Sequence, residues 1–243
     1  MRKYVALCVA VLLMLLGCED KSKKNEIKFA LCADYPPFEF YENGEKLVGF
    51  DVELAKAIAK KLGKKAIFKD MGIAAINASV ENGSVDAGIA ALSVTEEKKK
   101  SFDFSDSYCR TSVSIVCKVD NQMTDLAKIG NRKVASQMGC TAHGEVIKKR
   151  APQADVVLFD KMDAAIEALK AGHVNYVLLD GIPALEFCKN NRGLKCVSVG
   201  ENEEDYAILL RKNSHLKGPV NKALAELKSE GVVDQLERKY LGK

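Results

Sequence analysis

The 243-residue sequence contains no tryptophan, only 5 prolines and no large excess of charge of one sign. Its 37 basic residues nearly balance its 33 acidic ones, so we expect no nucleic-acid partner. Because 47% of the residues are hydrophobic and 29% are charged, intrinsic disorder and collagen-like structure are both excluded. The composition indicates a folded globular protein, with one large domain or two lobes of about 100 to 120 residues each.

Long hydrophobic runs are also scarce. The longest, residues 4–16, is shorter than the roughly 20 residues that a membrane-spanning helix requires. Two basic residues precede it, as in a secretory signal peptide, and its end at Cys18 resembles a bacterial lipobox, in which the cysteine is acylated after cleavage. We predict a lipoprotein signal peptide over residues 1–17, lipidation and a membrane tether at Cys18, and a polar linker over residues 18–25. The alternative is an ordinary signal peptide with an incidental Cys18.

Removal of residues 1–17 with Cys8, and lipidation of Cys18, would leave six cysteines available for pairing in a compartment where disulfides persist. They are Cys32, Cys109, Cys117, Cys140, Cys188 and Cys196. Cys109 and Cys117 lie about 26 Å apart on one predicted strand, so they cannot pair with each other. Cys188 and Cys196 flank a turn-like segment and are the candidate pair for a disulfide that closes a small loop. The alternative is that the cysteines are buried free thiols.

Beyond residue 26, hydrophobic periodicity alternates between strand and helix. The predicted strands cover residues 27–31, 66–69, 85–90, 133–136, 156–159 and 174–179. The predicted helices begin at Asp51 and then cover residues 73–81, 141–149, 163–170, 220–228 and 232–240. Such alternation is typical of parallel sheets that are covered by helices.

A weak internal repeat indicates two similar lobes. Val80, Gly83 and Val85, at the end of one predicted helix, have counterparts 89 residues later. The counterparts are Leu169, Gly172 and Val174.

Two segments are suited to connect these lobes. Residues 108–118 form a long run without glycine or proline, and residues 205–210 supply a return. We therefore predict an α/β fold with a two-lobed clamp and two hinge strands. The predicted division is residues 26–110 and 206–243 for lobe 1, and residues 111–205 for lobe 2.

Hinged lobes leave a cleft between them, and ligands of open α/β sheets bind at the carboxyl ends of strands, near helix N-termini. Three such strand ends carry polar or turn-forming residues: residues 91–93, residues 137–141 and Asp180. Each also has an ordinary interpretation as a turn or a helix cap. Their shared position nevertheless makes them the candidate ligand site.

Ordered motifs across residues 27–242 resemble those of the family-3 extracellular solute-binding proteins, the receptor components of bacterial ABC importers for polar amino acids. The motifs are DYPPFEF at 34–40, VGFDVELA at 48–55, the run 83–108 with LSVTE and FSD, and LKSEG at 227–231. This resemblance implies a two-lobed clamp outside the cytoplasm that captures a small polar solute and delivers it to a membrane permease. It implies a monomer without a cofactor, a metal or enzymatic activity.

The resemblance also assigns roles to single residues. Tyr35 would stack on the ligand's side chain, while Ser93 and the backbone of Ala91 would take its ammonium and carboxylate groups. Thr141 would bind the carboxylate from the second lobe, and Asp180 would pair with the α-ammonium. A zwitterion needs such partners of both kinds, because a buried unpaired charge is costly. Since the partners come from both lobes, we expect the ligand to favour the closed form.

Five positions help to define the ligand, most of them by departing from the family pattern. Lys98 stands where most amino-acid binders have an arginine, so it keeps the charge but loses the two-pronged contact with a carboxylate. Ile73 occupies an often aromatic position. Cys32 stands where binders of basic side chains can carry an acid, which argues against lysine, arginine or ornithine. Cys140 replaces a common serine or threonine, and Gln137 is placed to contact a polar ligand side chain.

Two alternatives remain open at this stage: a solute other than an amino acid, and an enzyme on the same fold, like the periplasmic cyclohexadienyl dehydratases. Such an enzyme needs a carboxyl group in the cleft as a general acid, and Glu39 and Glu145 are the candidates. Neither has a spacing that marks acid catalysis. His143, His173 and His215 lack metal-ligand spacing and are predicted to be surface or packing residues.

Overall fold

The computed structural model describes residues 25–123, 125–199 and 204–242. The predicted signal peptide, Cys18 and all but the last residue of the predicted linker lie outside these ranges, so those expectations stay predictions. Within the ranges, every helix is too short or too polar to cross a lipid bilayer.

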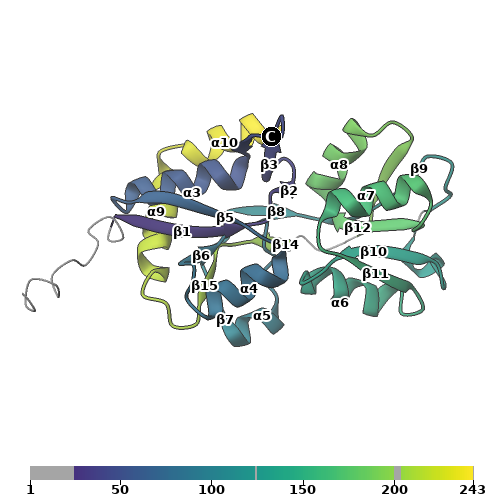
Figure 1. Cartoon of the computed structure of the whole chain (residues 1–243), viewed down its shortest axis with the longest axis horizontal. Helices are drawn as coiled ribbons and strands as arrows, with labels where there is room; N and C mark the ends of the chain where they lie inside the picture. Colours follow the sequence, from purple (N-terminus) through teal and green to yellow (C-terminus); the bar gives the residue numbers. More distant parts are fainter. Residues whose placement is uncertain (1–24, 124, 200–203, 243) are drawn as a thin grey trace, which may run out of the picture.

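Two five-stranded sheets, built on one topology, form the centres of the two halves of the molecule (Figure 1). The first has the order β5 (Lys65–Asp70), β1 (Glu26–Leu31), β6 (Ala87–Gly88), β15 (Leu209–Arg211), β7 (Phe102–Phe104). The second has the order β11 (Asp155–Phe159), β10 (Lys133–Gln137), β12 (Tyr176–Asp180), β9 (Val113–Lys118), β13 (Leu194–Ser198). In each, the first three strands are parallel and the fourth is antiparallel to both neighbours. The two lobes therefore repeat one arrangement, as the sequence repeat predicts.

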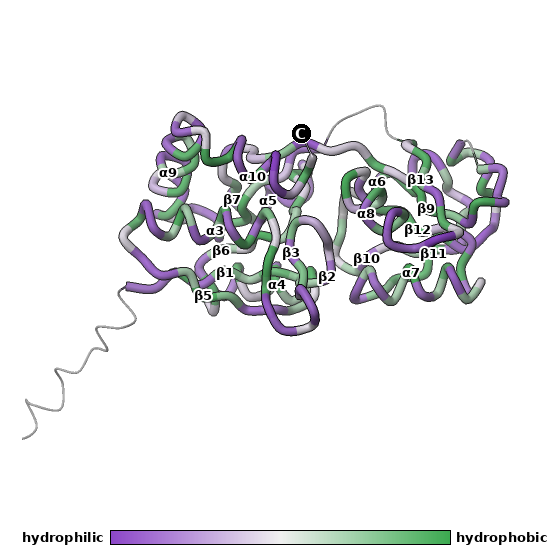
Figure 2. The backbone as a smooth tube through the Cα atoms, turned by 90° about the horizontal axis from the view of Figure 1, so that it is seen from above, coloured by the Kyte–Doolittle hydropathy of each residue, from purple (hydrophilic) through white to green (hydrophobic). Residues whose placement is uncertain are grey.

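Helices cover both faces of each sheet (Figure 1). The first sheet is covered by α3 (Phe50–Lys61), α9 (Lys217–Ser229) and α10 (Val232–Tyr240) on one side and by α4 (Ile73–Glu81) and α5 (Glu96–Ser101) on the other. The second is covered by α7 (Met162–Ala171) and α8 (Gly181–Asn190) on one side and by α6 (Thr141–Arg150) on the other. A short 3-10 helix, η1, spans Leu126–Lys128. Figure 2 shows hydrophobic stretches running through the interior of both halves, where they form the cores.

The glycines of the internal repeat end helices in both lobes. α7 buries Ile166 and Leu169 on one face and ends at Gly172, which has a φ of 80°. Gly83 follows α4 with a φ of 77°. Positive φ is strained for residues with a Cβ atom, so a glycine at this place lets the chain leave the helix and enter the next strand.

Each of the two predicted crossing strands is divided into two shorter strands in the structure. The expected strand over residues 108–118 is divided into β8 (Cys109–Thr111) and β9, with a break at Ser112, whose carbonyl accepts a hydrogen bond from Gly181 N at 2.6 Å. The expected return over residues 205–210 is likewise divided into β14 (Glu204–Tyr206) and β15. β8 and β14 pair with each other between the two large sheets. Each strand ends where the chain must change its partner, and hydrophobic periodicity does not report such a change.

Several aromatic side chains pack beside this crossing. Phe38 meets Tyr206 edge to face, with ring centroids 5.2 Å apart, and Phe50 stacks on Tyr108 at 5.9 Å. Phe38 belongs to the segment that links β2 (Asp34–Tyr35) to β3 (Glu39–Glu42), which pairs in turn with β4 (Lys46–Val48). Buried aromatic contacts of this kind add about 0.5 to 1.5 kcal/mol each beyond the burial of their area. They stabilise the part of lobe 1 from which the crossing strands emerge.

The six cysteines that the structure describes are free thiols, three of them buried and three partly exposed. Cys188 and Cys196 are therefore free thiols and do not form the disulfide that the sequence leaves open, although both are partly exposed rather than buried. Burial, together with the nearby Cys196 sulfur, raises the pKa of Cys188 to about 12.

Candidate ligand-binding site

The strand ends of both lobes meet at one small cavity. Seven of the eight predicted site residues line it: Tyr35, Ile73, Ala91, Ser93, Lys98, Gln137 and Asp180. Cys140 and His143 line it as well. Thr141, the eighth, begins α6 directly after Cys140, and its side chain lies outside the described part of the chain.

The two lobes touch each other across this cavity. The Tyr35 hydroxyl of lobe 1 donates to Asp180 Oδ2 of the second sheet at 2.9 Å and accepts from the Asp180 backbone N–H at 3.1 Å. Gln137 Nε2 approaches the sulfur of Cys32 at 3.6 Å, and the backbone N–H of Met162 donates to Asp34. The cavity measures about 20 Å³, close to the ~10–15 Å³ that one water molecule requires. An amino acid therefore enters only when the lobes separate and these contacts are exchanged.

Asp180 is the buried anion at the centre of the site. It ends β12 and precedes α8, but its side chain does not cap that helix and is directed to the other lobe instead. The residue is 2% exposed, and its second oxygen lies 3.4 Å from His143 Nε2. A carboxylate so buried needs donors around it, and Tyr35 and His143 supply them.

His143 is a site residue that the sequence analysis missed, because it was predicted to be a surface or packing residue. It lies on the first turn of α6, three residues after Cys140, and is only 1% exposed. Burial opposes its protonation, but the Cys140 sulfur and the Asp180 carboxylate hold the pKa of His143 well above its ordinary value. His173 and His215 are exposed, as predicted. The spacing of three from Cys140 was the available signal, since residues three apart share a helix face.

Ala91 presents its backbone to the cavity in an unusual conformation. Its φ is 45°, and its N–H donates to Asp51 Oδ2 at 2.7 Å. The Tyr108 hydroxyl donates to the same oxygen at 2.8 Å and so helps to fix it. Because the N–H is committed to Asp51, the backbone group that Ala91 offers to a ligand is its carbonyl oxygen, an acceptor suited to an ammonium group.

Ser93 brings a second missed residue into the site. Its hydroxyl donates to Glu204 Oε2 at 2.6 Å, and Ser93 also forms an isolated bridge with Tyr206. Burial, followed by the charge of Asp180, raises the pKa of Glu204. Glu204 stands on the crossing strand β14, far in sequence from every site motif, so nothing in the local pattern marked it.

Lys98 is buried, whereas Lys99 and Lys100 beside it are exposed. Thr95 caps α5 by accepting a hydrogen bond from the Lys98 backbone N–H at 3.2 Å, which fixes this turn at the edge of the cavity. Lys98 is 6% exposed; burial lowers its pKa, against the opposing charges of Cys140, Glu204 and Asp180. Lys98 is therefore placed at the cavity and is not a solvated surface lysine like its two neighbours.

The cavity thus holds groups of both charges. Asp180 is its carboxylate, Lys98 and His143 are its basic groups, and Glu204 lies beside it, bonded to Ser93. Ile73, 4% exposed at the start of α4, contributes an apolar wall. Such a set can satisfy both ends of a zwitterion.

The carboxyl groups considered for acid catalysis stand elsewhere. Glu39 is fully buried on β3, and Glu145 is partly exposed on α6. The described residues that line the cavity include neither of them.

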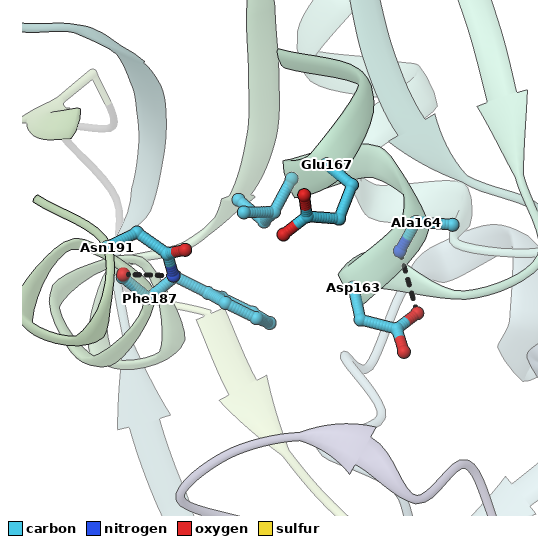
Figure 3. Close-up of a pocket in the computed structure, with 6 residues that line it drawn as sticks. Asp163, Ala164, Glu167, Phe187 and Asn191 are labelled. Atoms are coloured by element: carbon cyan, nitrogen blue, oxygen red, sulfur yellow. Dashed lines mark hydrogen bonds between the residues drawn. The ribbon is translucent and has the colours of Figure 1, made fainter. Parts of the chain in front are cut away.

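A larger surface pocket of about 390 Å³ lies between α7 and α8 (Figure 3). Asp163, which accepts a hydrogen bond from Ala164 N, and Glu167 form its acidic side, and Phe187 and Asn191 lie opposite. The described residues that line it include no basic side chain, so it offers no cation to a carboxylate. The smaller cavity between the lobes is the better candidate for a zwitterionic ligand.

Comparisons with known proteins identify the family of this chain. The family model described as bacterial extracellular solute-binding proteins, family 3, matches residues 27–243. The arginine-binding extracellular protein ArtP of Bacillus subtilis (strain 168) is 31% identical, over 97% of this chain and 95% of its own length.

Solved structures give the same result. An ancestral arginine-binding protein bound to glutamine is 40% identical with a TM-score of 0.84, covering 90% of this chain and 99% of its own. The ancestral amino-acid-binding protein AncCDT-1, described as a precursor of cyclohexadienyl dehydratase, is 28% identical with a TM-score of 0.83. The match covers 90% of this chain and 96% of AncCDT-1. The two-lobed fold and the family predicted from the motifs are confirmed. The chain belongs to the bacterial extracellular solute-binding proteins, family 3.

Proposed function

We propose that this protein is the solute-binding component of an ABC importer and that it captures one amino acid between its lobes. The observation that carries the proposal is the set of opposite charges in one inter-lobe cavity, with Asp180 and Lys98 at its centre. The relatives that bind amino acids support the same substrate class.

The proposed ligand contacts follow from the donors and acceptors of the site. The α-ammonium is bound by Asp180 and the Ala91 carbonyl, and the α-carboxylate by Lys98, Thr141 and Ser93, whose hydroxyl turns from Glu204 to the ligand. When the ligand enters, its ammonium replaces the Tyr35 hydroxyl as the partner of Asp180, and the Tyr35 ring is left to pack on the ligand's side chain. Each exchange keeps the buried charges paired.

The proposed ligand has a neutral side chain. Gln137 lines the cavity and reaches the Cys32 sulfur behind it, and the carboxylate next to Cys32, Asp34, is already bonded to the Cys32 thiol at 3.0 Å and to Met162 N–H. A basic side chain would have to break these bonds to find an anion. A small polar group fits the Gln137 amide instead.

The movement that the function needs is a hinge at β8 and β14, the strands between the two large sheets. We place lobe 1 at residues 26–110 and 206–243, and lobe 2 at residues 111–205. A ligand with partners in both lobes stabilises the closed form over the open one, and the closed form is the one that a permease would recognise.

The remaining parts of the proposal concern the setting. The protein acts outside the cytoplasm as a monomer, tethered to a membrane by lipid on Cys18, and transfers its solute to a membrane permease. It acts without a cofactor, and it is a binding protein rather than an enzyme, because Glu39 and Glu145 are not placed to act on a bound molecule.

A thermal-shift screen against the twenty amino acids tests the ligand class. The protein is first unfolded and refolded to remove carried-over ligand. An amino acid that binds only the folded state raises the melting temperature, and at a concentration of 100 Kd it adds about 2.7 kcal/mol. We expect neutral polar amino acids to give the largest shifts, confirmed by calorimetry. If no amino acid shifts the transition, the proposed substrate class is wrong.

Substitution of Lys98 tests its role at the carboxylate. Lys98→Met should weaken binding by about 1.5 to 3 kcal/mol, since the carboxylate would lose a charged partner in a buried site. Lys98→Arg should preserve or tighten binding, because it keeps the charge and can grip both oxygens. Lys99→Met, at the exposed neighbour, is the matched control and should bind normally. A folded Lys98→Arg protein that no longer binds would show that this pocket recognises something other than a carboxylate.

A further inference from the structure

Cys140 occupies an unusual position for a thiol. It is the residue at the N-terminus of α6, is partly exposed and makes no capping hydrogen bond with its side chain. It lines the inter-lobe cavity together with Lys98 and His143. A helix N-terminus and neighbouring cations are the surroundings that stabilise a thiolate, the reactive form of cysteine.

His143 gives this thiol a partner. Its Nε2 faces Asp180, while its Nδ1 is buried without a partner among the described residues. Cys140 is the neighbour whose sulfur interacts with the ring from the same helical turn. Thiol, imidazole and carboxylate thus follow one another across the cavity, the arrangement in which a histidine accepts a thiol proton and a carboxylate orients the ring.

The charged and titratable groups around this pair come from several elements. They are Tyr35 on β2, Lys98 on α5, Asp180 at the end of β12, and Glu204 on β14. Lys98 favours a negative sulfur, whereas Asp180 and Glu204 favour a protonated His143.

Other described cysteines lack these surroundings. Burial and the nearby Asp34 raise the pKa of Cys32, and burial raises the pKa of Cys117. Cys188, although partly exposed like Cys140, has a pKa raised to about 12 by burial and Cys196. Cys188 is therefore an internal reference for a thiol of similar exposure without an activating histidine.

We propose that Cys140 is a nucleophilic thiol within the ligand cavity, activated by His143, and that small disulfides modify it reversibly. The Cys140 sulfur, its proton passed to His143, attacks one sulfur of a disulfide R–S–S–R. A new bond forms between Cys140 and that sulfur, the original S–S bond breaks, and the other half leaves as a thiolate that takes up the proton. Cys140 is oxidised to a mixed disulfide and the leaving sulfur is reduced.

This modification would control ligand capture. The closed cavity measures only about 20 Å³, and Tyr35 bonds directly to Asp180 across it. The alkylthio group added to the Cys140 sulfur cannot fit while these contacts hold, so it keeps the lobes apart. A dithiol reductant removes the adduct and restores closure.

The test is the rate of modification at each cysteine of the purified full chain with bis(2-hydroxyethyl) disulfide, read by mass spectrometry of peptides. We expect Cys140 to react at least about tenfold faster than Cys188 at pH 7 and to keep reacting at pH 6. This comparison needs neither a variant nor a ligand, so it is independent of the proposed function. Equal rates at Cys140 and Cys188 would overturn the proposal.

Two variants separate activation from mere exposure. His143→Gln should slow Cys140 by about tenfold at pH 7 and move its rate profile to higher pH, whereas His173→Gln, at an exposed histidine, should leave both unchanged. An unchanged profile in His143→Gln would remove His143 from the activation. Any amino acid bound by the wild type should lose affinity at least about tenfold after disulfide treatment and regain it with dithiothreitol. Cys140→Ser should make binding indifferent to the treatment, and loss of binding in this variant after treatment would place the effect at another thiol.

Discussion

Replacement of Asp180 by Asn is expected to weaken amino-acid binding by about 1.5 to 3 kcal/mol, or roughly 10- to 150-fold in Kd. Asp180 is 2% exposed and is the carboxylate that we assign to the ligand's α-ammonium. Asparagine keeps the shape and can still accept from the Tyr35 hydroxyl, but it brings no charge to the ammonium. Calorimetry of both proteins with the best ligand from the screen measures the difference.

Tyr35→Phe is the matched control for this prediction. It removes the hydroxyl that bonds to Asp180 across the lobes at 2.9 Å, but it leaves the carboxylate and the aromatic ring in place. Because the ligand's ammonium replaces that hydroxyl, the affinity should change far less than in Asp180→Asn. Unchanged affinity in a folded Asp180→Asn protein would remove Asp180 from the site.

The sequence alone predicts most of the secondary structure, because the two lobes follow simple periodic patterns. The helices at 73–81 and 232–240 agree with α4 and α10 at both ends. The strand expected over 85–90 pairs only at β6, Ala87–Gly88, since the chain leaves the sheet and Ala91 takes a positive φ. Strand ends of this kind depend on hydrogen-bond partners distant in sequence, and local periodicity carries no information about them.

The residues of the candidate site were likewise predicted from the sequence only in part. Residues in ordered motifs, such as Tyr35 and Ser93, were placed by resemblance, and the structure brings them to one cavity. His143 and Glu204 were missed because each acquires its role from a residue that only folding brings near: Asp180 for His143, and Ser93 for Glu204. The chemistry of the motifs is local, whereas the pairing of buried charges depends on tertiary structure.

A second buried acid lies outside the ligand cavity, behind Ala91. Glu39 is completely buried on β3, and in the described part of the chain neither of its oxygens has a partner, nor does Asp51 Oδ1. The two carboxyl groups are neighbours. A proton on Glu39 explains why these oxygens can be buried side by side, because a carboxylic acid can donate a hydrogen bond to Asp51. The other oxygen of Asp51 accepts the hydrogen bond from Ala91 N–H.

Burial, with the charge of Asp51 next, raises the pKa of Glu39 well above its ordinary value of 4.5. The folded protein therefore keeps this proton at pH values at which the unfolded chain has lost it. The contribution to stability is fully present below pH 4.5 and falls as the pH rises toward the folded pKa, by up to about 1.4 kcal/mol per pH unit. Burial raises the pKa of Asp51 to about 6, so its contribution to stability also falls as the pH rises, over a narrower range of pH.

Glu39→Gln should therefore stabilise the protein at neutral pH. Glutamine keeps the shape and the donor to Asp51 but does not titrate, so the variant should match the wild type near pH 4 and exceed it by about 2 kcal/mol at pH 6. Urea unfolding at several pH values measures this, with Glu42→Gln, at an exposed glutamate of the same strand, as the control without effect. An advantage that does not grow with pH would mean that Glu39 is ionised in the folded protein, and its burial would then need a cationic partner that the described residues do not provide.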